Sequence, residues 1–94
     1  MNVYVSIGNS DDKLSQAKWA EYILEVREVL RGSASKVLGE WYSASDSNWQ
    51  NACFCITIPD QKIASEAKLK LTKIRKRFGQ DSVAWSDVSN TQFI

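Results

Sequence analysis

The 94-residue sequence contains no histidine, a single proline, two cysteines and four glycines. Without histidine it lacks the side chain that most often serves as a general base and as a transition-metal ligand. Two cysteines are too few for the disulfide framework of a small secreted domain. No apolar run approaches the ~20 residues of a membrane-spanning helix, and residues 2–10 do not resemble a signal peptide. We therefore expect a cytoplasmic protein that makes no membrane contact.

The two cysteines are expected to be small, half-buried side chains. Cys53 and Cys55 stand two residues apart in an apparent strand, so both point to one face. The strand rise separates their Cα atoms by roughly 6.5–7 Å, at or beyond the limit for an unstrained disulfide. A metal site needs further ligands, and a nucleophilic cysteine needs an activating base. With Asp11 and Asp12 interpreted as loop charges, we expect no catalytic residues, no metal ion and no cofactor, and hence no enzyme.

Length and composition indicate one globular domain over residues 1–94. Hydrophobic residues make up 44% and charged residues 24%, and the net charge is only +1. The charge is unevenly distributed, because all seven basic residues of the second half lie between Lys62 and Arg77. That segment contains one acidic residue, Glu66, so its local charge is +6.

Hydrophobic periodicity predicts six elements of secondary structure. Period-two alternation predicts strands over residues 3–8, 37–44, 52–58 and 82–86, with an irregularity at Gly39. A helix is expected after the N-cap Ser15 and before a C-terminal Gly32, with Leu14 packing on Trp19. A second helix follows the N-cap Asp60 and closes at Gly79. Their predicted buried stripes are Trp19, Tyr22, Ile23, Val26, Val29 and Leu30, and Ile63, Ala67, Leu71, Ile74 and Phe78.

The resulting order, β-α-β-β-α-β, predicts an α+β fold of the ferredoxin-like, split βαβ type. Right-handed crossovers place both helices on one face of a four-stranded antiparallel sheet. The opposite face is then open, and it displays Tyr4, Ser6, Cys53, Cys55 and Thr57. Either Trp41 or Tyr42 joins them, because a one-residue change of register exchanges the two. The segment through Phe93 and Ile94 either extends the fourth strand, forms a fifth, or covers this open face.

A predicted hairpin loop carries the first candidate binding site. Trp49 lies in the polar stretch Ser45–Asn51, where nothing near it in sequence covers it. An exposed tryptophan is a common anchor in protein interfaces. We predict that Trp49 contacts a partner together with Asn48, Gln50, Trp41 and Tyr42. The alternative is that Trp49 folds back over the open sheet face.

The second predicted helix carries the other candidate surface. Lys62, Leu69, Lys73 and Lys76 lie opposite its apolar stripe. Lys68 and Arg75 flank one side of the helix, and Lys70 and Arg77 flank the other. This face suits a phosphate backbone or an acidic protein patch. Alternatively, it is a solvated face whose basic residues favour the C-terminal end of the helix dipole.

The sequence thus favours a small protein-binding module. It suits an inhibitor or adaptor of the kind that phages and mobile elements encode, which acts by contact with a host protein or complex. The alternative is a nucleic-acid-binding protein that uses the basic second helix. A third hypothesis is a homodimer joined through open sheet faces with a small-molecule pocket between them. Both monomer and homodimer remain open.

Overall fold

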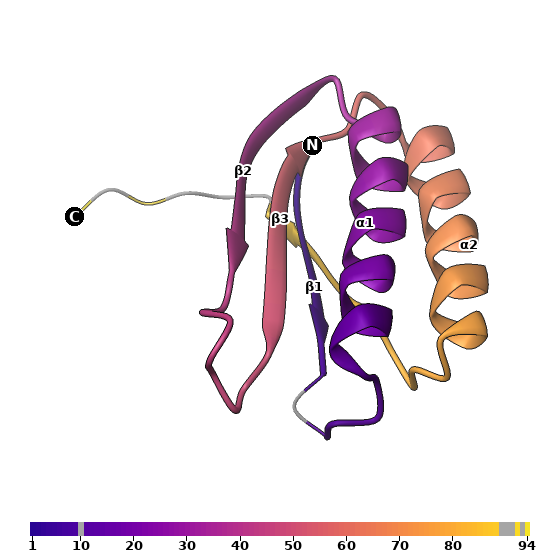
Figure 1. The fold of residues 1–94 in the computed structure, drawn as a ribbon. Helices are drawn as coiled ribbons and strands as arrows, with labels where there is room; N and C mark the ends of the chain where they lie inside the picture. Colours follow the sequence, from indigo (N-terminus) through magenta and orange to yellow (C-terminus); the bar gives the residue numbers. More distant parts are fainter. Residues whose placement is uncertain (10, 89–91, 93) are drawn as a thin grey trace.

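The computed structural model describes residues 1–9, 11–88, 92 and 94. Their elements are β1 (Asn2–Gly8), α1 (Gln16–Ser33), β2 (Lys36–Tyr42), β3 (Asn51–Thr57), α2 (Gln61–Arg77) and β4 (Ala84–Val88). These strands form one antiparallel sheet in the order β2-β3-β1-β4. Both helices cover the same face and leave the other uncovered (Figure 1). The predicted ferredoxin-like α+β fold is confirmed.

The first helix begins as predicted and ends later than predicted. The Ser15 hydroxyl accepts a hydrogen bond from the Lys18 amide at 3.2 Å, which satisfies one unpaired donor of the first turn. The expected C-terminal glycine, Gly32, instead lies inside the helix. The helix ends at Ala34, whose extended backbone still donates its N–H to the Leu30 carbonyl at 2.9 Å. No left-handed residue is needed there, so glycine is not required.

The second helix matches the sequence prediction at both ends. The Asp60 carboxylate accepts a hydrogen bond from the Ile63 amide at 2.9 Å. Gly79 adopts a φ of 68°, the left-handed conformation that terminates many helices and that glycine adopts without steric cost. The amide of Gln80 then donates to the Arg75 carbonyl at 2.8 Å, which closes the last turn.

Strand boundaries depart from the prediction by one or two residues. The second strand occupies Lys36–Tyr42, and its register shifts between Val37 and Gly39, as the expected irregularity at Gly39 implied. The last strand is Ala84–Val88 rather than residues 82–86, because it pairs with β1 from Ser6↔Ala84 to Asn2↔Val88. The predicted extension or fifth segment reaches residues 89–91 and 93, which lie outside the described residues.

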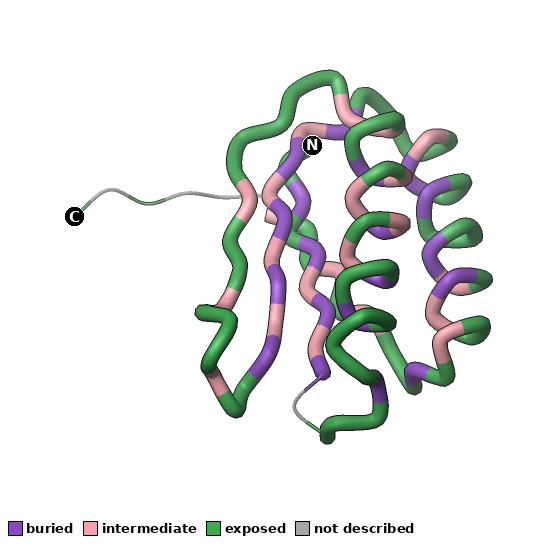
Figure 2. Tube along the Cα trace, viewed as in Figure 1, coloured by how far each residue is buried: buried purple, intermediate pink, exposed green. Residues whose placement is uncertain are grey.

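The core lies between the sheet and the helices, as the burial pattern in Figure 2 shows. The two central strands bury alternate residues, with Val3, Val5 and Ile7 in β1 facing Ala52, Phe54 and Ile56 in β3. Helix α1 contributes Trp19, Tyr22, Val26 and Leu30, and helix α2 contributes Ala64, Ala67, Leu71 and Ile74. Of these only Ala64 is missing from the predicted stripes. The predicted Ile23, Val29, Ile63 and Phe78 pack at the margin of the core.

One core residue carries a polar group without a visible partner. Tyr22 is 1% exposed, and its ring lies 5.1 Å from that of Phe78 and 6.2 Å from that of Trp19. Its hydroxyl makes no hydrogen bond among the described residues. Burial raises the pKa of this hydroxyl to about 12. The ring therefore stabilises the folded state, whereas the buried hydroxyl oxygen lowers its stability.

We predict that Tyr22→Phe raises the free energy of unfolding by about 1 kcal/mol at pH 7, because it removes an unpaired buried hydroxyl and keeps the ring. Urea unfolding followed by tryptophan fluorescence measures the change. Because the folded pKa lies above the unfolded value of 10.0, the native protein should also lose stability as the pH rises from 10 towards 12, and the variant should lose less. A variant less stable at pH 7 by 1 kcal/mol would contradict the prediction.

Candidate functional site

The loop between β2 and β3 presents Trp49 to solvent. This side chain is 71% exposed, the highest value among the aromatic side chains that the structure describes. Its backbone is nevertheless fixed, since its amide donates to the Ser47 hydroxyl at 3.1 Å and its carbonyl accepts from Asn51 Nδ2 at 3.3 Å. The Ser43 amide bonds to the Asn51 carbonyl at 2.9 Å and closes the base of the loop. Trp49 does not fold back on the sheet, so the alternative placement is wrong.

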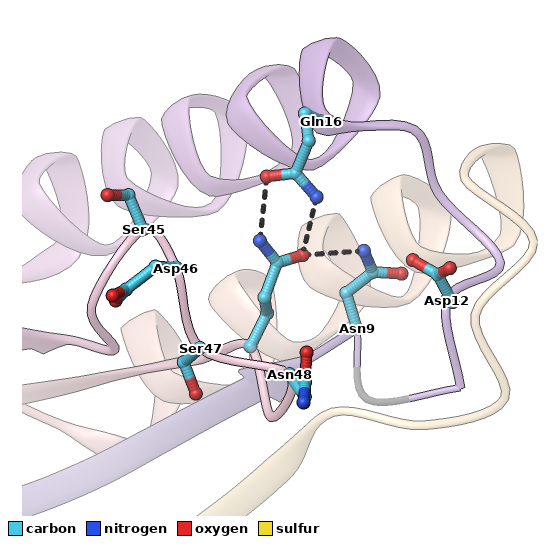
Figure 3. A pocket seen from close by; sticks show the side chains of 8 residues that line it. Asn9, Asp12, Gln16, Ser45, Asp46, Ser47 and Asn48 are labelled. Atoms are coloured by element: carbon cyan, nitrogen blue, oxygen red, sulfur yellow. Dashed lines mark hydrogen bonds between the residues drawn. The ribbon is translucent and has the colours of Figure 1, made fainter.

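Gln50, predicted as a contact residue, is instead buried at 7% exposure. Its side-chain oxygen accepts from Asn9 Nδ2 and from Gln16 Nε2, each at 3.0 Å, and its Nε2 donates to Gln16 Oε1 at 2.7 Å (Figure 3). The Asn9 amide also bonds to the Gln50 carbonyl at 2.8 Å. Because these bonds engage both ends of the Gln50 amide, the residue anchors the loop and is not an exposed contact residue.

Asn9 is a structural residue that sequence reasoning missed. It is 2% exposed, although it lies in a polar loop where an exposed asparagine is expected. Its side chain accepts from the Leu14 amide and donates to the Leu14 carbonyl, both at 3.0 Å. It therefore joins the start of α1 to the hairpin. Only the sheet register brings Asn9 and Gln50 together, so no local pattern identifies the pair.

A polar pocket of about 380 Å³ lies beside this amide network. Its walls come from the loop before α1, the first turn of α1 and the β2–β3 loop (Figure 3). The lining residues are Asn9, Asp12, Gln16, Ser45, Asp46, Ser47, Asn48 and Gln50. Asp12 and Asp46 supply two carboxylates, and the others supply amides or hydroxyls. Such a lining suits a hydrogen-bonding or cationic group.

The register settles which aromatic of β2 faces the open side of the sheet. Trp41 pairs with Cys53, whereas Tyr42 pairs with the buried Ala52. Trp41 therefore lies on the open face, where it is 57% exposed. Tyr42 lies on the helix side, with its ring 5.9 Å from that of Phe54 in an edge-on arrangement. Of these two predicted contact residues, Trp41 is the one that the open face presents.

Tyr42 belongs to a polar cluster at the β2 edge. Arg31 of α1 donates two hydrogen bonds to the Glu40 carboxylate, at 2.8 and 2.9 Å, and the Tyr42 hydroxyl donates a third at 2.9 Å. The Arg31 guanidinium, assisted by the Tyr42 hydroxyl, lowers the pKa of Glu40 below its usual 4.5. Burial and the bond to Glu40 raise the pKa of Tyr42. The cluster joins β2 to α1 through side-chain hydrogen bonds.

The basic helix is confirmed as an element, and its cations fall into two groups. Lys62, Lys73 and Lys76 are exposed beside Leu69, which is 65% exposed. Within the described residues, no ion pair engages these three lysines. Of the cations on one flank, Arg77 forms an ion pair with Glu25 of α1, whereas Lys70 is exposed and forms no ion pair within the described residues.

On the other flank, Lys68 and Arg75 lie at a groove between α2 and β4. The Lys68 ammonium is 5.0 Å from the centre of the Trp85 ring. Arg75, predicted on the outward basic face, is half-buried and donates to the Gln80 carbonyl at 3.1 Å. That bond stabilises the end of α2, so Arg75 is only partly available to a partner. The groove has a volume of about 200 Å³ and is also lined by Leu71, Thr72 and Val83.

The cysteines occupy the open sheet face as predicted. Both are half-buried and neither forms a disulfide. Hydrogen bonding with Cys55 raises the pKa of Tyr4, its neighbour across the β1–β3 pair. Across the described residues, no three His, Cys, Asp or Glu side chains gather in a way that could hold a metal ion. The helices within the same residues are too short or too polar to cross a membrane.

No protein-family model matches this chain, and a search of curated proteins finds no relative.

We predict that Glu40→Gln lowers the free energy of unfolding by about 1 kcal/mol at pH 7, because a bidentate charge-assisted contact is lost. The depressed pKa means that this stabilisation is present above pH 4.5 and disappears as the pH falls through the folded pKa. Urea unfolding of both proteins at pH 7, 5, 4 and 3 should show the difference shrinking with acidity.

Glu21→Gln is the matched control, since Glu21 forms an exposed pair with Lys18 at 3.1 Å. This variant should change stability by less than about 0.5 kcal/mol at every pH. A Glu40→Gln deficit that stays constant down to pH 3 would contradict the electrostatic origin of the effect.

Proposed function

We propose that this chain is a non-enzymatic protein-binding module that inserts Trp49 into a partner. The observation that carries the proposal is the combination of a 71% exposed indole with a fixed backbone. A tryptophan whose backbone is hydrogen-bonded before binding loses little backbone entropy on association, and tryptophan is enriched among residues that dominate binding energy.

The pocket beside the loop indicates the chemistry of the partner. Asp46 and Asn48 line it and belong to the same loop as Trp49, while Asp12 lines it from the loop before α1. Two carboxylates near an apolar anchor favour a partner surface that has an apolar hollow for the indole and a Lys or Arg side chain for the pocket. Such a pairing suits an inhibitor or adaptor that occupies a surface of a host protein, as small phage or mobile-element proteins do.

Trp49→Ala should weaken binding to the partner by about 2 kcal/mol or more, roughly 30-fold in Kd, because the anchor is lost. Calorimetry with the purified partner, recovered by affinity capture with the native chain, measures the change. The circular dichroism spectrum and the unfolding midpoint should stay the same, since the side chain is exposed.

Leu69→Ala is the matched control, because Leu69 is a similarly exposed apolar residue on α2. It should leave the Kd within about twofold of the native value. Equal affinity of the native chain and Trp49→Ala would remove Trp49 from the interface and reject the proposal.

A second candidate function is nucleic-acid binding through α2. The specific observation in its favour is the cluster of unpaired lysines, Lys62, Lys73 and Lys76, on the exposed face of that helix. Phosphates bound there release counterions, so affinity must fall steeply with salt. The net charge of only +1 makes long-range attraction weak and ranks this function second.

If α2 binds nucleic acid, the native chain should shift single- or double-stranded DNA or RNA in 50 mM salt. The double variant Lys73→Gln/Lys76→Gln should then reduce the slope of log affinity against log salt by about 2. Lys18→Gln on α1 is the control and should leave the slope unchanged, because Lys18 already pairs with Glu21. The absence of any shift in 50 mM salt would exclude this second function.

A further inference from the structure

The open face of the sheet is almost free of charge. Strand register places on it Trp41, Gly39 and Lys36 of β2, Cys53, Cys55 and Thr57 of β3, Asn2, Tyr4 and Ser6 of β1, and Ala84, Ser86 and Val88 of β4. Lys36, at one corner, is the only charged residue in this set. Trp41 is 57% and Tyr4 44% exposed, so both large aromatic side chains are accessible. A surface of this kind favours a protein over a nucleic acid as its occupant.

Side-chain size varies systematically across this face. One row crosses the sheet from Trp41 through Cys53 and Ser6 to Ala84, so a large residue lies at the β2 edge and a small one at the β4 edge. In the next row, the β2 position is Gly39, the large residue is the central Tyr4, and its β3 neighbour is Cys55. The large residue lies on the β2 side of the midline in the first row and on the β1 side in the second, and in each row the position that mirrors it across the midline is small.

We propose that this open face pairs with the open face of a second copy, around a two-fold axis that runs parallel to the strands along the midline. Such a rotation places the β2 edge of one copy over the β4 edge of the other. Trp41 then lies over Ala84 of the partner subunit, and Tyr4 lies over Cys55 of the partner subunit. Each large side chain meets a small one, which is the complementarity that face-to-face sheet packing requires.

The size of the face indicates how strong this association is. Three strands of seven residues and one of five give a flat footprint of about 410 Å², from the usual strand spacing and rise. Stable interfaces bury about 800 Å² per partner, so this one lies at the weak end. A weak, reversible dimer is therefore expected. Dimerisation through the open face is independent of what Trp49 binds. A dimer would nevertheless present two Trp49 loops and so strengthen binding to a repeated target.

Sedimentation velocity from about 5 to 500 µM tests the proposal. The native chain should shift from monomer to dimer over this range. Trp41→Ala and Ala84→Lys should each raise the dimer Kd by about 100-fold or more, because a two-fold interface contains every contact twice. Trp49→Ala, which removes an equally large side chain from the hairpin loop, is the control and should dimerise like the native chain. Circular dichroism checks that each variant is folded.

A size exchange tests the direction of the axis. Ala84→Trp added to Trp41→Ala places the large residue on the β4 edge and the small one on the β2 edge, so the same axis should restore dimerisation to within about tenfold of native. Failure of this double variant to dimerise, when it is folded, would overturn the proposed arrangement. A native chain that stays monomeric at 500 µM would overturn the dimer itself, whether residues 89–94 or a different protein then covers the face.

Discussion

One-sided burial of the two central strands is the constraint on which the rest of the structure depends. β1 and β3 alternate strictly, with Val5 and Phe54 paired on the covered face and Tyr4 and Cys55 paired on the other. Both helices lie on the covered face, so the described residues supply no helix for the opposite one. Because the helices cover only one side of the sheet, the other face is open, the outward side of α2 meets solvent, and the β2–β3 loop projects from the sheet.

A buried amide network then turns a loop into a rigid feature. Asn9, Gln16 and Gln50 come from three separate segments, and their side chains hydrogen-bond to one another. Asn9 and Gln50 are buried, whereas Gln16 lies at the exposed end of the network. Unpaired buried amides are costly, so the network fixes the β2–β3 loop relative to the start of α1. The position of Trp49 follows directly from this arrangement: its neighbour Gln50 attaches the loop to the rest of the fold, and Trp49 itself stays exposed. The exposed Trp49 and the buried Gln50 that supports its loop therefore have different environments, although they are adjacent in sequence.

The basic side chains of α2 fall into two groups, those at the margins of the helix and those on its outward side. At its margins Arg77 pairs with Glu25, Lys68 lies over Trp85, and Arg75 bonds to the Gln80 carbonyl. These cations help to attach the helix to its neighbours. The lysines on the outward side have no such role and determine the electrostatic character of that surface. A helix with a local charge of +6 thus exposes fewer available cations than its sequence suggests.

The sequence by itself determined the element order, the caps at Ser15 and Asp60, the left-handed Gly79 and most of the core, because each depends on local periodicity or on neighbours within one turn. Only the tertiary structure decided that Gln50 is buried and that Trp41 rather than Tyr42 faces outward. The bond between Gln50 and Asn9 joins residues 41 positions apart, and the orientation of Trp41 depends on its pairing with Cys53. Cross-strand register and long-range hydrogen bonds leave no periodic signal in the chain, so these features emerge only when the sheet is assembled.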